Sequence, residues 1–116
     1  MNSLGETGLP QHALNAIQGV LERYPGVERA ILYGSRAKGS YRTGSDIDLT
    51  LKGNLDYPGL LRLECELDDL LLPWKMDLSL YEHLDNPALI EHIDRVGKLL
   101  YQRGDPAVGP ASQRSS

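Results

Sequence analysis

The sequence predicts a single α/β domain, of the α+β kind, in which about four helices flank one small mixed β-sheet. Three observations lead to this prediction. A chain of 116 residues can build one modest hydrophobic core but not two. Apolar residues recur every three or four positions in some segments and alternate with polar residues in others. Proline and glycine separate these segments, so we expect helices and strands to follow one another along the chain.

Two long segments and one short segment are expected to form the first helices. Residues 10–24 carry alanine, leucine, isoleucine and valine at helical spacing, and the Pro25-Gly26 pair ends the pattern. Residues 59–72 place leucines along one side of a further helix, which Pro73 terminates. Between these two segments, residues 36–40 can form a single helical turn.

The last helical segment starts at Asn86, a good capping residue directly before Pro87. Its apolar stripe consists of Leu89, Ile90, Ile93, Val96, Leu99 and Leu100. Because the stripe keeps helical spacing throughout, the sequence predicts one helix that continues to Arg103. Gly104 is then the expected C-terminal cap of this helix.

Three segments show the alternation that is typical of strands. They are residues 27–33, 45–51 and 74–81. In the second and third of these segments, one face is apolar and the other carries carboxylates and hydroxyls. This pattern predicts a sheet that buries one face and leaves the other face polar.

The ordered domain is predicted to span residues 10–103. Residues 1–9 are polar and contain glycine, and we expect them to be flexible. Residues 104–116 are rich in proline, glycine, serine and alanine, which cannot bury enough surface to order the chain. The apolar faces of the later helices exceed what one small sheet can cover, so we expect a protein partner or a homodimer.

Composition argues against several classes of protein. The net charge of −4 lacks the basic balance that holds nucleic acid by its backbone, so this chain alone is not expected to bind nucleic acid. The single cysteine, Cys65, rules out an intrachain disulfide and a cysteine-built zinc site, which suits a reducing cytoplasm. The N-terminal residues do not have the pattern of a signal peptide, and no apolar run approaches the ~18 residues that span a membrane.

Two aspartates on the second predicted strand, Asp46 and Asp48, are the strongest chemical signal. Residues two apart on a strand face the same side, ~7 Å apart along the backbone. Their carboxylates can converge on a pair of Mg²⁺ ions, as in two-metal nucleotidyl transfer. Asp77 lies on the polar face of the third strand and would join them if the two strands pair. Three carboxylates without a cation would repel one another, and a metal ion relieves this cost.

A glycine-serine turn precedes these acids by ten residues. Gly34 lets the backbone approach a ligand closely, and Ser35 offers a hydroxyl. A helical turn that starts there would direct N–H groups at a phosphate, and Arg36 can bind phosphate oxygens through two donors. Lys38 and Arg42 are interpreted as solvated loop charges. The turn and the acids together predict a site that grips a polyphosphate from one side and a metal ion from the other.

The run Gly34-Ser35, ten residues and then Asp46-Ile47-Asp48, with a later aspartate on a strand, resembles the DNA polymerase β-type nucleotidyltransferase superfamily. More narrowly, it is similar to the minimal nucleotidyltransferases of prokaryotes, which often act as MntA-type antitoxins beside a HEPN-domain partner. The resemblance covers residues 10–103. It implies that Asp46 and Asp48 bind both metal ions and that Asp77 completes the catalytic metal site. The residues that it implies for the triphosphate of ATP are Gly34, Ser35, Arg36 and Ser45.

The resemblance implies transfer of AMP from ATP to a hydroxyl, with release of pyrophosphate. In the antitoxin branch the acceptor is a tyrosine of the HEPN toxin, which the modification silences. Two alternatives stay open: an antitoxin that masks its partner without catalysis, and a transferase that acts on a small molecule or on tRNA. The set of three acids argues against pure masking, and the negative net charge argues against RNA as the sole substrate.

The remaining reactive side chains are expected to be structural. The histidines have no metal-ligand spacing to one another or to cysteine. They are His12, His83 and His92. Cys65 is interpreted as a packing residue of a helix. Trp74 and Tyr81, which flank the third strand, are expected to pack rather than to stack on a base.

Overall fold

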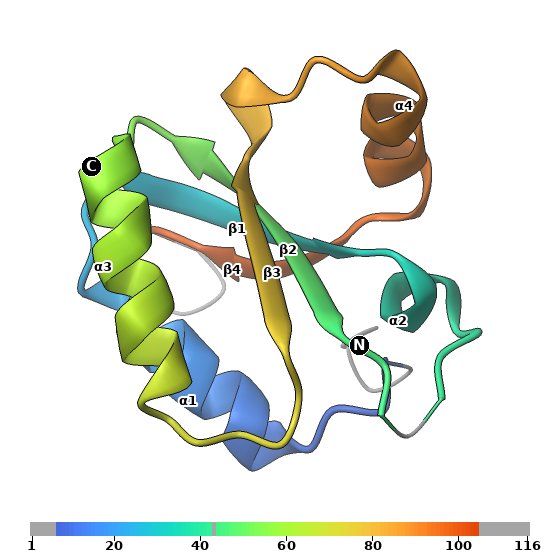
Figure 1. Cartoon of the computed structure of the whole chain (residues 1–116), viewed down its shortest axis with the longest axis horizontal. Coiled ribbons are helices and arrows are strands. Elements are labelled where there is room, and N and C mark those ends of the chain that lie inside the picture. Colours follow the sequence, from blue (N-terminus) through green and yellow to red (C-terminus); the bar gives the residue numbers. More distant parts are fainter. Residues whose placement is uncertain (1–6, 43, 105–116) are drawn as a thin grey trace.

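The computed structural model describes residues 7–42 and 44–104. Its helices and strands alternate along most of the chain (Figure 1). In order they are α1 (Gln11–Glu22), β1 (Val27–Tyr33), α2 (Ser35–Lys38), β2 (Ile47–Gly53), α3 (Tyr57–Asp68), β3 (Met76–Leu80), the 3₁₀ turn η2 (Tyr81–His83), α4 (Pro87–Val96) and β4 (Lys98–Gln102). Within the described residues, no helix has the length and apolar character needed to cross a membrane.

One four-stranded mixed sheet organises the molecule, with the strand order β3-β2-β1-β4. β1 runs antiparallel to both β2 and β4, whereas β2 and β3 are parallel. The parallel pair is possible because the connection through α3 carries the chain back to the start of the sheet. This architecture confirms the predicted α/β fold with a small mixed sheet.

The main core lies between one face of the sheet and the helices α1 and α3, which contact each other (Figure 1). The inward residues of β2 are Ile47, Leu49 and Leu51, each at most 1% exposed. By the alternation of a strand, Asp48 faces the other side of the sheet. α4 contacts β1 and lies away from α1 and α3. The polar face of the sheet remains partly exposed to solvent, for example at Asp77.

The predicted helix over residues 87–103 is wrong in its second half. α4 ends just before Gly97, and the chain then forms the edge strand β4. Gly97 has extended backbone angles (φ −60°, ψ 144°), and its N–H closes the last turn of α4 at 2.8 Å. Pairing of β4 with β1 satisfies the backbone of this segment and outweighs the helical spacing of its apolar residues. Gly104, with φ +70°, therefore follows a strand and does not cap a helix.

The described part of the N-terminal segment differs from the predicted flexible residues 1–9. Thr7 is fully buried and Leu9 is 5% exposed, and Leu9 belongs to the main core. Residues 7–9 therefore pack onto the domain. The predictions for residues 1–6, and for the tail beyond Gly104, lie outside the described residues.

The junction between α4 and β4 can be tested by two alanine substitutions. Gly97→Ala is expected to destabilise the fold by about 1–3 kcal/mol. Its Cβ atom would lie 2.5 Å from the Ile93 carbonyl oxygen and 2.6 Å from Ile31 Cγ2. The control is Gly19→Ala in α1, where a Cβ atom meets nothing within 4 Å and should stabilise the helix by about 0.5–1 kcal/mol. Urea denaturation measures both free energies of unfolding, and an unchanged value for Gly97→Ala would contradict the close packing.

Candidate active site

Strand pairing places two of the three predicted acids side by side. In the parallel pair of β2 and β3, Asp48 lies in register with Asp77. On its other side, Asp48 lies in register with Tyr33, the last residue of β1. Since residues directly opposite each other point to the same face, these three side chains share one face of the sheet. Asp46 comes directly before β2 and is exposed.

The charges of the three aspartates act on one another. Burial raises the pKa of Asp48, and the negative charges of Asp77 and Asp46 raise it further. A hydrogen bond with Asp77 also raises this pKa, whereas His92 lowers it. Among the described residues, no three histidine, cysteine or acidic side chains are arranged as a metal-binding group. Asp48 is half-buried, whereas Asp46 and Asp77 are exposed, so solvent reaches two of the three acids.

The glycine-serine turn lies directly against one of these acids, Asp48. Gly34 follows β1 with φ +79°, in the region that favours glycine. A Cβ atom at this position would overlap the Asp48 carboxylate. Ser35 begins the short helix α2 and is half-buried. The predicted phosphate-binding turn and the predicted metal-binding acids thus lie together in the folded chain.

Arg36 lies in α2, and its side chain is directed into the protein. Its side chain is 1% exposed. Nε donates to the Ser45 carbonyl oxygen at 3.1 Å, and Nη1 donates to the Thr7 carbonyl oxygen at 2.7 Å. These hydrogen bonds to main-chain carbonyl groups offset the cost of burying the charged guanidinium. The expectation that Arg36 binds the triphosphate stays a prediction, and in the folded chain two of its side-chain donors are directed at main-chain oxygens.

Ser45 lies in the loop that leads to Asp46. Its hydroxyl accepts a hydrogen bond from the Arg42 backbone N–H at 2.7 Å, and its carbonyl oxygen accepts from Arg36. These contacts give Ser45 a structural part in the loop. Its place beside a nucleotide stays a prediction.

Two residues of the site have no clear signal in the sequence patterns. Nε2 of His92 on α4 accepts a hydrogen bond from the Gly34 backbone N–H at 3.2 Å. The His92 ring meets Tyr33 edge-on, with the ring centroids 6.2 Å apart. Burial raises the pKa of Tyr33, and the charges of Asp48 and Asp77 add to this effect. Tyr33 could be found from its position directly before the turn, but 58 residues separate His92 from Gly34.

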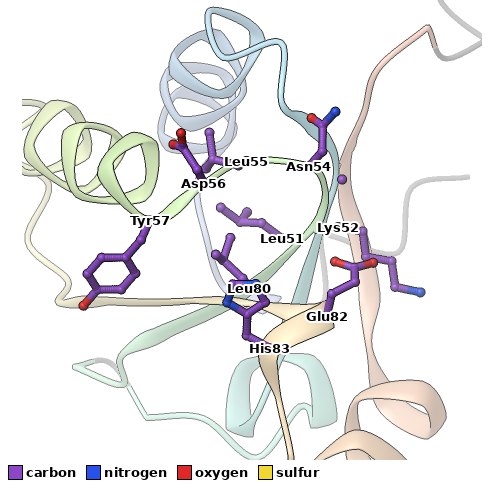
Figure 2. Close-up of a pocket in the computed structure, with 10 residues that line it drawn as sticks. Leu51, Lys52, Asn54, Leu55, Asp56, Tyr57, Leu80, Glu82 and His83 are labelled. Atoms are coloured by element: carbon purple, nitrogen blue, oxygen red, sulfur yellow. The ribbon is translucent and has the colours of Figure 1, made fainter.

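A cavity of about 320 Å³ lies at the other end of β2 (Figure 2). Its lining includes Lys52 of β2, Tyr57 of α3 and His83 of η2. Asp48 lies near the first residue of β2, whereas Lys52 lies near its last, so this cavity is separate from the acids. The position of His83 agrees with the interpretation that it has no catalytic role.

The raised pKa of Asp48 predicts a pH dependence of stability in the metal-free protein. The folded state takes up a proton at Asp48 at a higher pH than the unfolded chain does. The ionised carboxylate therefore costs stability at neutral pH, and this cost disappears as the pH falls through the raised pKa. In EDTA at pH 7, Asp48→Asn should raise Tm by a few degrees. Thermal unfolding down to about pH 4 should show this difference shrinking, and a constant difference would contradict its electrostatic origin.

The fold and the site together define a nucleotidyltransferase. Residues 15–106 match the family described as Polymerase beta, Nucleotidyltransferase, and the chain therefore belongs to this family. The matched segment contains the glycine-serine turn and all three aspartates. Comparison with curated protein sequences gives no significant match.

Several solved structures share the fold. A toxin–antitoxin structure with AMP-PNP is 24% identical with a TM-score of 0.62, and the match covers 82% of this chain and 78% of that chain. A MntA–HepT toxin–antitoxin structure is 22% identical with a TM-score of 0.60, covering 84% of this chain and 76% of that chain. A tri-AMPylated HEPN toxin from Shewanella oneidensis in complex with MNT antitoxin gives the same four values. At these identities the likeness shows a common fold.

Proposed function

We propose that this chain is a Mg²⁺-dependent nucleotidyltransferase that transfers AMP from ATP to a tyrosine hydroxyl of a HEPN-domain partner toxin. One observation carries the proposal. Asp48 lies in register with Asp77 on the neighbouring strand and directly against Gly34, and the charge of Asp46 acts on its carboxylate. Membership in the nucleotidyltransferase family supports the chemistry. The single cysteine, which is free, supports a cytoplasmic location.

The oxygen ligands of the three aspartates have the chemistry that a divalent cation needs, although their side chains do not form a three-residue metal-binding group in the described structure. Mg²⁺ prefers oxygen ligands, and in nucleotide sites it takes one or two carboxylates together with waters and phosphates. The acidic neighbours of Asp48 make its ionised form unfavourable, and a cation would relieve this repulsion. We therefore assign Asp46, Asp48 and Asp77 as the ligands of two ions. Mg²⁺ bound there would supply charge neutralisation for the phosphates of ATP.

The glycine-serine turn is assigned to the triphosphate. Because Gly34 has no side chain, a phosphate can approach its backbone, and the Ser35 hydroxyl can donate to a phosphate oxygen. The acceptor hydroxyl gives its proton to a base, for which the Asp77 carboxylate is the candidate. Its oxygen bonds to the α-phosphorus, the bond from the α-phosphorus to the oxygen bridging to the β-phosphate breaks, and pyrophosphate leaves. Asp77 is exposed on the edge strand β3, where an incoming hydroxyl can reach it.

The proposed acceptor is a protein. Two structures of the same fold hold an antitoxin with its toxin, and in one of them the HEPN toxin is tri-AMPylated. Within residues 7–42 and 44–104, four large apolar side chains are exposed, and they could contact a partner. They are Tyr57, Leu61, Leu71 and Leu99. These features support a hetero-oligomer of this chain with the toxin.

ATP labelled at its α-phosphate tests the proposal. With Mg²⁺ and a HEPN-domain protein encoded by a neighbouring gene, we expect the label to appear on that protein and to be lost in EDTA. ATP labelled at the γ-phosphate should give no labelled protein, since pyrophosphate leaves. Label on a small molecule or tRNA without the partner would favour that alternative acceptor. Failure of the label to transfer to any acceptor would contradict the catalytic function.

A further inference from the structure

We propose that Arg36 is a positioning residue that holds the nucleotide-binding turn and the metal-binding strands in one fixed arrangement. This inference rests on the proposed function and assigns a role that differs from phosphate binding. Arg36 directly follows Ser35 in the chain, so any movement of its backbone moves the turn. Its side chain, in contrast, reaches the segments that lead to the acids.

Two hydrogen bonds connect the Arg36 side chain to other segments of the chain. Nε donates to the carbonyl oxygen of Ser45, the residue directly before Asp46, at 3.1 Å. Nη1 donates at 2.7 Å to the carbonyl oxygen of Thr7, which is fully buried. One side chain thus connects the turn, the entry of β2 and the N-terminal segment. A guanidinium suits this task because its donors diverge in a rigid plane.

Two aromatic rings also lie close to the guanidinium. Its central carbon lies 5.0 Å from the centroid of the Tyr41 ring and 5.5 Å from that of Trp74. Both distances are within the range of a cation–π interaction. Tyr41 belongs to the loop between the turn and β2, and Trp74 precedes β3, which carries Asp77. Arg36 therefore contacts the approaches to both metal-binding strands.

The N-terminal segment packs against the Tyr41 ring. Gly8 has φ +78°, and a Cβ atom there would lie 2.5–2.7 Å from atoms of the Tyr41 ring. Gly8 thus lies close to the same Tyr41 ring that contacts the Arg36 guanidinium. Arg36 is buried and directs Nε and Nη1 at main-chain oxygens, so we infer that it acts on the reaction through the placement of other groups.

Two substitutions at this position distinguish positioning from phosphate binding. Arg36→Lys keeps the charge but cannot reproduce the two divergent hydrogen bonds, and Arg36→Met removes charge and donors together. Lys38→Met is the control, because Lys38 is exposed on the same short helix. We expect both Arg36 variants to lower kcat by about 10–100-fold and to change KM for ATP by less than about threefold. Lys38→Met should match the wild type.

Hydrogen exchange gives a readout that does not depend on activity. In nucleotide-free protein, both Arg36 variants should exchange faster than wild type over the described residues of the loop 39–46, whereas Lys38→Met should not. Unchanged exchange in folded Arg36→Lys would overturn the proposal. So would a normal kcat with a KM raised tenfold or more, which is the signature of a phosphate ligand. If the wild type transferred no AMP, the proposed function would fail, and the exchange comparison alone would decide the role of Arg36.

Discussion

Replacing Asp46 and Asp48 together with asparagine is expected to lower AMP transfer by at least about 10³-fold while the protein stays folded. Asparagine has nearly the shape of aspartate but no negative charge, so it cannot replace a carboxylate ligand of Mg²⁺. The half-buried position of Asp48 between two strands should accept the neutral side chain without rearrangement. Transfer is measured with α-labelled ATP, and folding is followed by circular dichroism.

The control for this prediction is Asp68→Asn, an exposed acid at the end of α3. It also removes a negative charge but lies outside the site, and we expect the wild-type rate. A double variant that kept more than about a tenth of the wild-type rate would contradict the metal assignment. Full protection of cells by the inactive double variant would show that masking of the toxin suffices.

The local part of the site could be predicted from the sequence because a strand has a period of two. This period places Asp46, Asp48 and Asp77 on polar faces without any knowledge of the fold. Whether the acids meet depends on which strands pair. The parallel pairing of β2 with β3 sets Asp48 opposite Asp77. The turn at Gly34 could likewise be found, because glycine lets the backbone adopt a positive φ and approach a ligand closely.

The rest of the site depends on contacts between distant segments, which no local pattern contains. Arg36 beside Ser35 invites assignment to a phosphate, and only the folded chain brings the carbonyl groups of Thr7 and Ser45 to it. His92 reaches the turn because α4 packs against β1. The edge strand β4 carries apolar residues at helical spacing, and its pairing with β1 decides its conformation.

Gly34→Ala is expected to destabilise the protein by about 2–4 kcal/mol and to lower AMP transfer by about 10²-fold or more. One cause is the backbone, because φ +79° with ψ −155° is a combination that essentially only glycine adopts, and it costs a residue with a Cβ atom about 1–3 kcal/mol. The other cause is the overlap of that Cβ atom with the Asp48 carboxylate. Asp48 is held in register with Tyr33 on one side and Asp77 on the other, so relief of the overlap must displace the acid or the turn.

Gly39→Ala separates these two causes. Gly39 has φ +83° and ψ 6°, in the left-handed region, and a Cβ atom there meets nothing within 4 Å. Its variant therefore carries the cost of a left-handed backbone without any steric contact. It should lose about 1–2 kcal/mol and keep a transfer rate near that of the wild type. Urea denaturation measures the loss of stability in both variants. The rate of label transfer reports the contact between the turn and the acid, since the backbone cost at Gly39 should leave this rate unchanged. Equal losses of stability and equal rates in the two variants would mean that the turn does not press on Asp48, and the two halves of the proposed site would no longer be joined.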